Sequence, residues 1–298
     1  MAGGQKKRIV RMTKRNYSYE DMRENLWELR QRYRDIIDVR ILERTADQRN
    51  IYCICLGNPV AKQSIVIDAA LHGREWLNTQ LIMGILEFYC KNYDRGKYQG
   101  RYYRELFDEI CVYLLPMMNP DGVTISQFGA EKIHNEDLNR LVFQLGQGKE
   151  AIWKSNSRGV DLNRNYDSRF DENPVKIPSY EEYGGESPLS EPESRAVVRL
   201  IKKVNPSAVI NYHETGSLIY YTKSSSVLKT THRVTKYPMV KEEMGSPGCL
   251  GDWLEQQGIS YCTLETCRGK APVGHWQIYP TYIRNRNLLA ALAKGIYE

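Results

Sequence analysis

A histidine and a glutamate stand three residues apart in DAALHGREWLNTQ, residues 68–80, where an apolar run gives way to an amphipathic one. His72 and Glu75 could supply two ligands to a zinc ion, because a loop that turns into a helix can bring both side chains onto one ion. A catalytic zinc site uses three protein ligands and keeps one position open. Taken alone, the stretch is also typical of a polar loop with a helix cap, so a third ligand is required.

The candidate third ligand is a histidine at the end of a strand pattern. Among the five histidines of the chain, His213 ends the long apolar run SAVINYH. A sheet can place this strand end beside the strand end that precedes His72. On these residues alone, a structural role for His213 stays open.

Two further stretches carry polar groups suited to the same chemistry. In RGVDLNRNYD, residues 158–167, Asn163 and Arg164 pair an amide with a guanidinium that can bind a carboxylate through two hydrogen bonds. Asp161 could accept the hydrogen bond that a zinc-bound histidine usually donates. The composition of this stretch by itself is that of a polar surface loop.

A glutamate, Glu265, interrupts the apolar strand pattern YCTLETC. A buried carboxylate is costly unless it is paired or functional. The functional interpretation is a general base that faces a metal-bound water, and the alternative is a salt bridge to an arginine.

The elements that must position these residues alternate between strands and helices. Apolar residues three to four apart predict helices over residues 19–33, 77–93, 190–205 and 281–297, the third with a capping box between Ser190 and Glu193. Continuous apolar runs predict strands within residues 50–57, 63–73, 109–116, 207–213 and 259–267. This alternation predicts the α/β class: a single-domain α/β/α sandwich with a mixed, twisted central sheet and helices on both faces.

Length and composition favour one large soluble domain. The chain has 298 residues, 41% hydrophobic and 26% charged, and a net charge of +6. The densest basic cluster, KKRIVRMTKR, lies in an expected N-terminal tail, residues 1–17, which we interpret as solvated. No nucleic-acid-binding motif follows this tail, so we expect no nucleic-acid partner.

The chain shows no signal-peptide pattern and no apolar run long enough to cross a membrane. We therefore expect a cytoplasmic protein with no membrane partner, or a secreted one whose leader is absent from this sequence. Seven cysteines, mostly within apolar runs, indicate buried thiols rather than a disulfide framework.

Six motifs in order, HGRE, NPDG, GVDLNRNYD, SEPE, YH and TLE, resemble the zinc carboxypeptidase family, the funnelins related to carboxypeptidase A. The resemblance covers residues 18–298, and six ordered motifs are far more specific than any one of them. It implies that His72, Glu75 and His213 bind one catalytic Zn2+ and that Glu265 is the general base and acid. Asp161 falls where the family places the partner of its first histidine.

The resemblance also implies how substrate is held. Arg74 matches an arginine that helps to bind substrate, and Asn163 and Arg164 match the pair that holds a terminal carboxylate. One departure is Lys154 in IWKSNSRG, which stands where pancreatic members carry an arginine that polarises the scissile carbonyl. A lysine offers a point charge instead of a fork, so we expect Lys154 or Arg74 to stabilise the oxyanion with less geometric control.

A second departure concerns KYPMVKEEMGSPGCLGDW, residues 236–253, which has no tyrosine where pancreatic members have a mobile one. This stretch, with GGESPLSEPE and LETCRG, resembles bacterial members that cut γ-D-glutamyl-diamino acid bonds in peptidoglycan peptides. We expect Tyr237 and Arg268 to line the substrate pocket. The residue that the family uses at the pocket base falls near Gly251, which carries no charge.

These features predict a zinc metallopeptidase of the metallocarboxypeptidase or γ-glutamyl-diamino acid peptidase type. Its partner would be a peptide substrate with a free carboxylate, including cell-wall muropeptides, and we expect a monomer by default. The alternatives are a zinc amidase or deacylase of the aspartoacylase type and a catalytically silent peptide-binding protein of the same fold.

Overall fold

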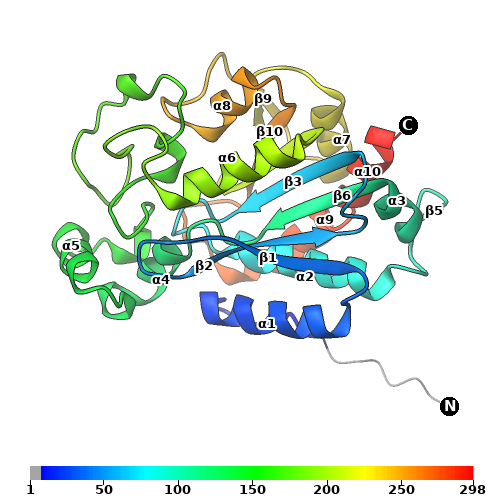
Figure 1. Cartoon of the computed structure of the whole chain (residues 1–298), viewed down its shortest axis with the longest axis horizontal. Helices are drawn as coiled ribbons and strands as arrows, with labels where there is room; N and C mark the ends of the chain where they lie inside the picture. Colours follow the sequence, from blue (N-terminus) through cyan, green and yellow to red (C-terminus); the bar gives the residue numbers. More distant parts are fainter. Residues whose placement is uncertain (1–7, 298) are drawn as a thin grey trace.

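Strands from both halves of the chain form one eight-stranded sheet in the order β1-β2-β6-β3-β7-β10-β8-β9 (Figure 1). The structure is a computed structural model that describes residues 8–297. The sheet strands are β1 (Ile37–Arg44), β2 (Asn50–Leu56), β3 (Gln63–Ala69), β6 (Ile110–Leu115), β7 (Ala208–Glu214), β8 (Leu218–Tyr221), β9 (Met239–Lys241) and β10 (Tyr261–Thr266). A separate hairpin pairs β4 (Lys97–Tyr98) with β5 (Arg101–Tyr102).

The sheet is mixed, as predicted. Its centre is parallel, because β3 pairs in parallel with β6 and β7, and β7 pairs in parallel with β10. The neighbouring pairs β1/β2, β2/β6 and β10/β8 are antiparallel. Parallel strands buried on both faces read as continuous apolar runs, which is why the runs in β3, β6 and β7 were visible in the sequence.

Helices cover both faces of the sheet, which confirms the predicted α/β/α sandwich (Figure 1). They are α1 (Tyr19–Arg32), α2 (Leu77–Asn92), α3 (Tyr103–Glu109), α4 (Pro120–Phe128), α5 (Glu136–Gly146), α6 (Pro192–Val204), α7 (Ser226–Thr235), α8 (Leu250–Gln256), α9 (Ile278–Asn285) and α10 (Leu288–Tyr297). Within residues 8–297, every helix is too short or too polar to span a bilayer.

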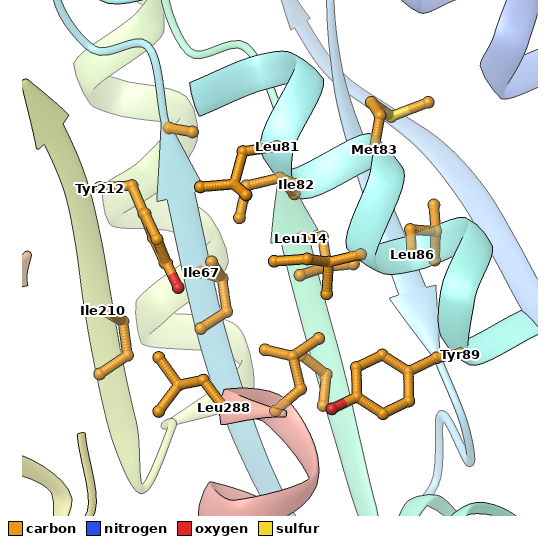
Figure 2. Close-up of a cluster of buried hydrophobic side chains, with 14 of the residues drawn as sticks. Ile67, Leu81, Ile82, Met83, Leu86, Tyr89, Leu114, Ile210, Tyr212 and Leu288 are labelled. Carbon is orange, nitrogen blue, oxygen red and sulfur yellow. The ribbon is translucent and has the colours of Figure 1, made fainter. Parts of the chain in front are cut away.

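Alternation along the strands divides the apolar side chains between the two faces. Figure 2 shows Ile67 of β3 and Ile210 and Tyr212 of β7 packed under Leu81 and Leu86 of α2. The opposite face buries Val66 and Val209 against α6 and α8. Because side chains of a strand alternate between faces, Asn211 and His213 lie on this second face, with Val209.

Two expectations about helices need correction. The C-terminal pattern forms two helices, α9 and α10, because the helical hydrogen bonding is interrupted at residues 286–287. The capping box at Ser190 is wrong: α6 begins with Pro192 after Glu191 as N-cap. Proline at the first helical position fixes where the helix begins, and the Ser190 hydroxyl donates instead to the Glu191 carboxylate at 2.9 Å.

The expectation of seven free thiols is also wrong for one pair. The structure joins Cys55 of β2 and Cys111 of β6 in a disulfide, and the Cα atoms of this pair lie 6.3 Å apart. Adjacent strands bring two cysteines within the range that a disulfide requires. The remaining five cysteines are free and buried.

The interpretation of residues 1–17 as a solvated tail fails for the part that the structure describes. Ile9, Val10 and Tyr17 are buried, and the backbone N–H groups of Ile9 and Val10 donate to the Glu87 carboxylate of α2. Residues 8–17 therefore pack on the domain, because apolar side chains between the basic ones reach its core. Residues 1–7 of the expected tail lie outside the described residues.

Candidate metal centre

The carboxyl ends of β3, β7 and β10 meet at one edge of the sheet because the three strands are parallel. His72 follows the end of β3, whereas His213 and Glu265 lie within β7 and β10, opposite each other in register. Ligand sites of α/β sheets form at such strand ends. Residues separated by up to 193 positions in sequence thus come together here.

The loop that carries His72 is held by a close approach of two backbones. A Cβ atom on Gly73 would lie 2.4 Å from the carbonyl oxygen of Gly122 in the NPDG turn, so only glycine fits there. The Gly73 N–H donates to the Lys154 carbonyl oxygen at 3.0 Å. This contact explains why HGRE, NPDG and the segment around Lys154 occur together.

Three buried side chains converge at the strand ends. His72 Nδ1 lies 2.7 Å from Glu75 Oε1, and His213 Nδ1 lies 3.1 Å from Glu75 Oε2. One ligand atom from each of the three residues lies within 4.8 Å of the other two. Two imidazole nitrogens and one carboxylate oxygen are the donor set of a catalytic His2Glu zinc site, so these residues fit a zinc ion.

The charges of the three groups favour a bound cation. Burial alone would raise the pKa of Glu75, but His72 and His213 lower it well below the usual range. Burial would lower the pKa of His213, yet its hydrogen bond to Glu75 and that negative charge raise the pKa to about 9. A metal ion replaces protons at such ligands, so binding would release protons.

Asp161 lies behind the first histidine. Its Oδ1 is 3.4 Å from His72 Nε2, the ring nitrogen on the side away from Glu75. Burial would raise the pKa of Asp161, but the Lys154 ammonium and His72 hold it well below its usual value. This geometry is that of a carboxylate that orients a metal-binding histidine.

Lys154, Arg164 and an unpredicted glutamate form one ion-pair network beside the centre. Lys154 Nζ lies 2.7 Å from Asp161 Oδ2 and 2.9 Å from Glu182 Oε1. Arg164 donates to Glu182 Oε2 through Nε at 3.0 Å and Nη2 at 2.6 Å. Lys154 and Arg164, two of the cations expected to meet substrate, are therefore paired with carboxylates of the chain itself.

Glu265 faces the same centre from β10. Burial raises the pKa of Glu265 to about 8, with His213 lowering it and Glu75 raising it. Its Oε2 atom is buried without a hydrogen-bond partner among the described residues. No arginine pairs with Glu265 in residues 8–297, so the salt-bridge alternative is not what the structure shows.

These groups open onto one cavity of about 200 Å³. Six of the residues singled out from the sequence line it: His72, Lys154, Asn163, Arg164, His213 and Glu265. The side-chain oxygen of Asn163 accepts from the backbone N–H of Leu250 at 3.0 Å, which fixes its amide. The two candidate histidine ligands, Glu265 and the asparagine-arginine pair therefore share one space, with Glu75 in contact with both histidines.

Glu75 and Asp161 contact the histidines without lining this cavity, and three other predicted residues do not line it either. Arg74 is turned toward Glu181, at 3.1 Å, and the Ile152 carbonyl oxygen. The expectation that Tyr237 lines the pocket is wrong, because its ring is buried in the main core and its hydroxyl accepts from Asn285. Arg268 is not in the pocket either: it is exposed, and its backbone pairs with the Gln277 side chain.

A family model for zinc carboxypeptidases matches residues 22–263. The chain belongs to the zinc carboxypeptidase family. Family membership supports a metallopeptidase function and implies zinc as the metal and peptides as the class of substrate. The matched range contains all three candidate ligands and ends just before Glu265.

Two curated relatives of this chain are bacterial. YqgT of Bacillus subtilis (strain 168) is 30% identical over 269 residues, 85% of this chain and 71% of that protein. Gamma-D-glutamyl-L-diamino acid endopeptidase 1 of Lysinibacillus sphaericus is 29% identical over 217 residues, 68% of this chain and 53% of that protein. The chain thus spans about half the length of the endopeptidase.

The fold is shared with solved structures. The crystal structure of thrombin activatable fibrinolysis inhibitor superposes with a TM-score of 0.74 at 21% identity, covering 93% of this chain and 73% of that chain. At this identity the comparison shows the fold and no more.

Several residues in or beside the cavity were not found from the sequence. Asn211 and Thr263 stand two positions before His213 and Glu265 on their strands, so alternation alone would have placed them on the same face. Glu242 and Glu182 carry no comparable signal. Glu182 belongs to an irregular segment and reaches Arg164 with a backbone φ of 69°.

Proposed function

We propose that this chain hydrolyses a peptide bond next to a residue with a free carboxylate, with His72, Glu75 and His213 as ligands of one zinc ion. The observation that carries the proposal is the convergence of these ligands and Glu265 at one sheet edge, beside a cavity that Arg164 also lines. Zinc, when bound, supplies a Lewis acid that activates water and polarises a carbonyl group.

Glu265 is the group that moves the proton. A carboxylate with a pKa near neutrality can take a proton from the attacking water and return it to the leaving amine. Burial raises the pKa of Glu265 above its ordinary value, so this carboxyl group can hold the proton until it passes to the leaving amine. In its ionised form the unpartnered Oε2 atom is available to accept that proton.

The cations of the cavity bind the substrate. Arg164 and Asn163 dock the carboxylate of the leaving residue, because a guanidinium matches a carboxylate in geometry. The Lys154 ammonium stabilises negative charge that develops on the carbonyl oxygen. To dock the substrate carboxylate, Arg164 must exchange its contact with Glu182 for one with the substrate.

Nucleophilic catalysis by a thiol is not part of the proposal. The cysteines that flank Glu265 on β10 and just beyond it are both buried. Burial raises the pKa of Cys262 to about 12 and that of Cys267 to about 11, so both stay protonated at neutral pH.

For the substrate we propose γ-D-glutamyl-diamino acid peptides from peptidoglycan. The proposal is supported by the sequence likeness to the Lysinibacillus endopeptidase and by the departures from the pancreatic pattern in residues 236–253. Since the chain spans only part of that relative, the activity of the whole relative is a guide to this chain and not a property of it.

The decisive experiment incubates zinc-loaded protein with defined muropeptides, ordinary C-terminal peptides and acyl-amino acids, followed by mass spectrometry of the products. We expect cleavage of the γ-D-glutamyl bond. Cleavage of acyl-amino acids alone would indicate an amidase of the aspartoacylase type, and an absence of all products would indicate a silent peptide-binding protein.

A further inference from the structure

The floor of the cavity is a polar row that crosses neighbouring strands. Asn211 of β7 pairs in register with Thr263 of β10, and Thr263 pairs with Tyr220 of β8. All three residues line the cavity. Asn211 and Thr263 stand two residues before His213 and Glu265 on their strands. They therefore lie on the same face of the sheet, further from the strand ends.

Asn211 offers an unused acceptor to this space. The residue is 2% exposed, and its Oδ1 atom has no hydrogen-bond partner among residues 8–297. A buried amide oxygen without a donor costs about 1–3 kcal/mol. A ligand that brings an N–H group to the floor of the cavity would satisfy it.

The position near Gly251, which by analogy would define the pocket, is neutral for a steric reason. A Cβ atom on Gly251 would lie 2.7 Å from Cε2 of Tyr261, a ring that also lines the cavity. No side chain fits there while Tyr261 keeps its place. A charged group that recognises the side chain of the substrate must therefore come from another element.

That charge is on Glu242, directly after β9. Glu242 lines the cavity, and no cation of the described chain pairs with its carboxylate. The other fixed charges of the lining are already matched, since Lys154 and Arg164 contact Glu182, and Asp252 pairs with Arg169 at 2.7 Å. Apart from the candidate metal ligands, the unpaired charges of the cavity are Glu242 and Glu265, and both are carboxylates.

We propose that this cavity selects a leaving residue whose side chain ends in an ammonium group, with Glu242 as its ion-pair partner and Asn211 Oδ1 as its acceptor on the floor. The inference rests on the proposed function, because it assumes that the leaving residue occupies the cavity with its carboxylate on Arg164. The proposal names Glu242 as the residue that sets a preference for an ammonium side chain, which the uncharged Gly251 position does not predict.

Binding measurements test this selection without depending on turnover. Zinc-loaded protein is titrated calorimetrically with Nα-acetyl-lysine and with Nα-acetyl-norleucine, which has nearly the same shape but no ammonium group. We expect the lysine derivative to bind at least about tenfold more tightly, as for one charge-assisted contact. The preference should weaken as salt is added.

Variants of two adjacent glutamates supply the matched control. Glu242→Gln should reduce the lysine preference to less than about threefold, and Glu242→Lys should shift the preference to Nα-acetyl-glutamate. Glu243→Gln removes a neighbouring exposed carboxylate that does not line the cavity, and it should keep the full preference. Thermal unfolding of each variant checks that the fold is intact.

Equal or undetectable binding of the lysine and norleucine derivatives by the wild type would overturn the inference. So would a lysine preference that survives in folded Glu242→Gln. A clear lysine preference in protein that hydrolyses no peptide would instead refute the proposed function and leave the selectivity of the cavity standing.

Discussion

Arg164 and Glu182 form a forked ion pair in which Nε and Nη2 of the guanidinium both contact Glu182 Oε2, at 3.0 and 2.6 Å. The other carboxylate oxygen accepts from Lys154 at 2.9 Å. An internal carboxylate thus holds the group that we expect to dock the carboxylate of the substrate. Substrate binding in this arrangement is an exchange of one carboxylate for another.

Glu182→Gln should therefore lower the KM for peptides with a free terminal carboxylate, by about two- to fivefold, because a partly exposed ion pair contributes about 0.5–1 kcal/mol. The kcat should change less than the KM, because Lys154 loses its contact with Glu182 but keeps the one with Asp161 at 2.7 Å. Steady-state kinetics of this variant beside exposed Glu186→Gln would check the exchange. A higher KM in Glu182→Gln would show that Glu182 positions Arg164 for substrate and does not compete with the substrate carboxylate.

Glu265→Gln should retain zinc and lose about two to four powers of ten in kcat, because glutamine cannot accept a proton from water. Its volume is nearly unchanged, so the fold should persist. The comparison requires metal content by atomic emission spectrometry alongside turnover. A near-normal rate in the zinc-loaded variant would remove Glu265 from its role as base.

Metal removal should abolish activity and lower stability together. His72, Glu75 and His213 are brought together and buried only in the folded domain, so zinc binds the folded state in preference to the unfolded chain and its removal lowers stability. Phenanthroline treatment, followed by re-addition of zinc, should abolish and then restore turnover, and His213→Ala should bind zinc far more weakly. Full turnover in a verified zinc-free sample would contradict the assignment.

Lys154→Met should destabilise the fold by about 3–5 kcal/mol, because it leaves the buried carboxylate of Asp161 without its main cation. Lys154 and Asp161 lie 2.7 Å apart, and the pKa of Lys154 is raised despite burial, chiefly by the charge of Asp161. Urea unfolding measures the loss, and Lys154→Arg, which keeps the charge, should restore most of it. Unchanged unfolding in Lys154→Met would mean that His72 alone suffices for Asp161.

Glu193→Gln should stabilise the protein increasingly as pH rises. Burial, then the charges of Asp121 and Glu191, raise the pKa of Glu193 well above its usual value. The folded state therefore holds this proton more tightly than the unfolded chain does. Its contribution to stability is complete below the unfolded pKa of about 4.3 and is lost as pH rises toward the folded pKa, at up to roughly 1.4 kcal/mol per pH unit.

Melting temperatures of the wild type and Glu193→Gln between about pH 5 and pH 8 would measure this effect, with exposed Glu186→Gln as the control. The difference between Glu193→Gln and the wild type should widen with pH. A constant difference would mean that Glu193 does not titrate differently in the folded and unfolded states.

Local patterns in the sequence were sufficient for the α/β class, whereas the set of candidate ligands also required the resemblance of six ordered motifs to a known family. Buried parallel strands read as apolar runs, and α1 and α2 follow the spacing of their apolar side chains. His72, Glu75 and His213 lie at strand ends that any sheet of this class brings to one edge. One exception was the start of α6, which the pattern placed at Ser190 and which the structure places at Pro192.

Contacts across the sheet and between loops were decided only by the tertiary structure. The order of the strands sets Asn211 beside Thr263, and it brings Cys55 to Cys111. An irregular segment turns Glu182 toward Arg164, and the segment after β9 brings Glu242 to the cavity. The sequence determined which polar residues stand at the strand ends, because the periodicity that marks a strand is local. Which loop carboxylates contact that region depends on long-range packing, which no local pattern encodes.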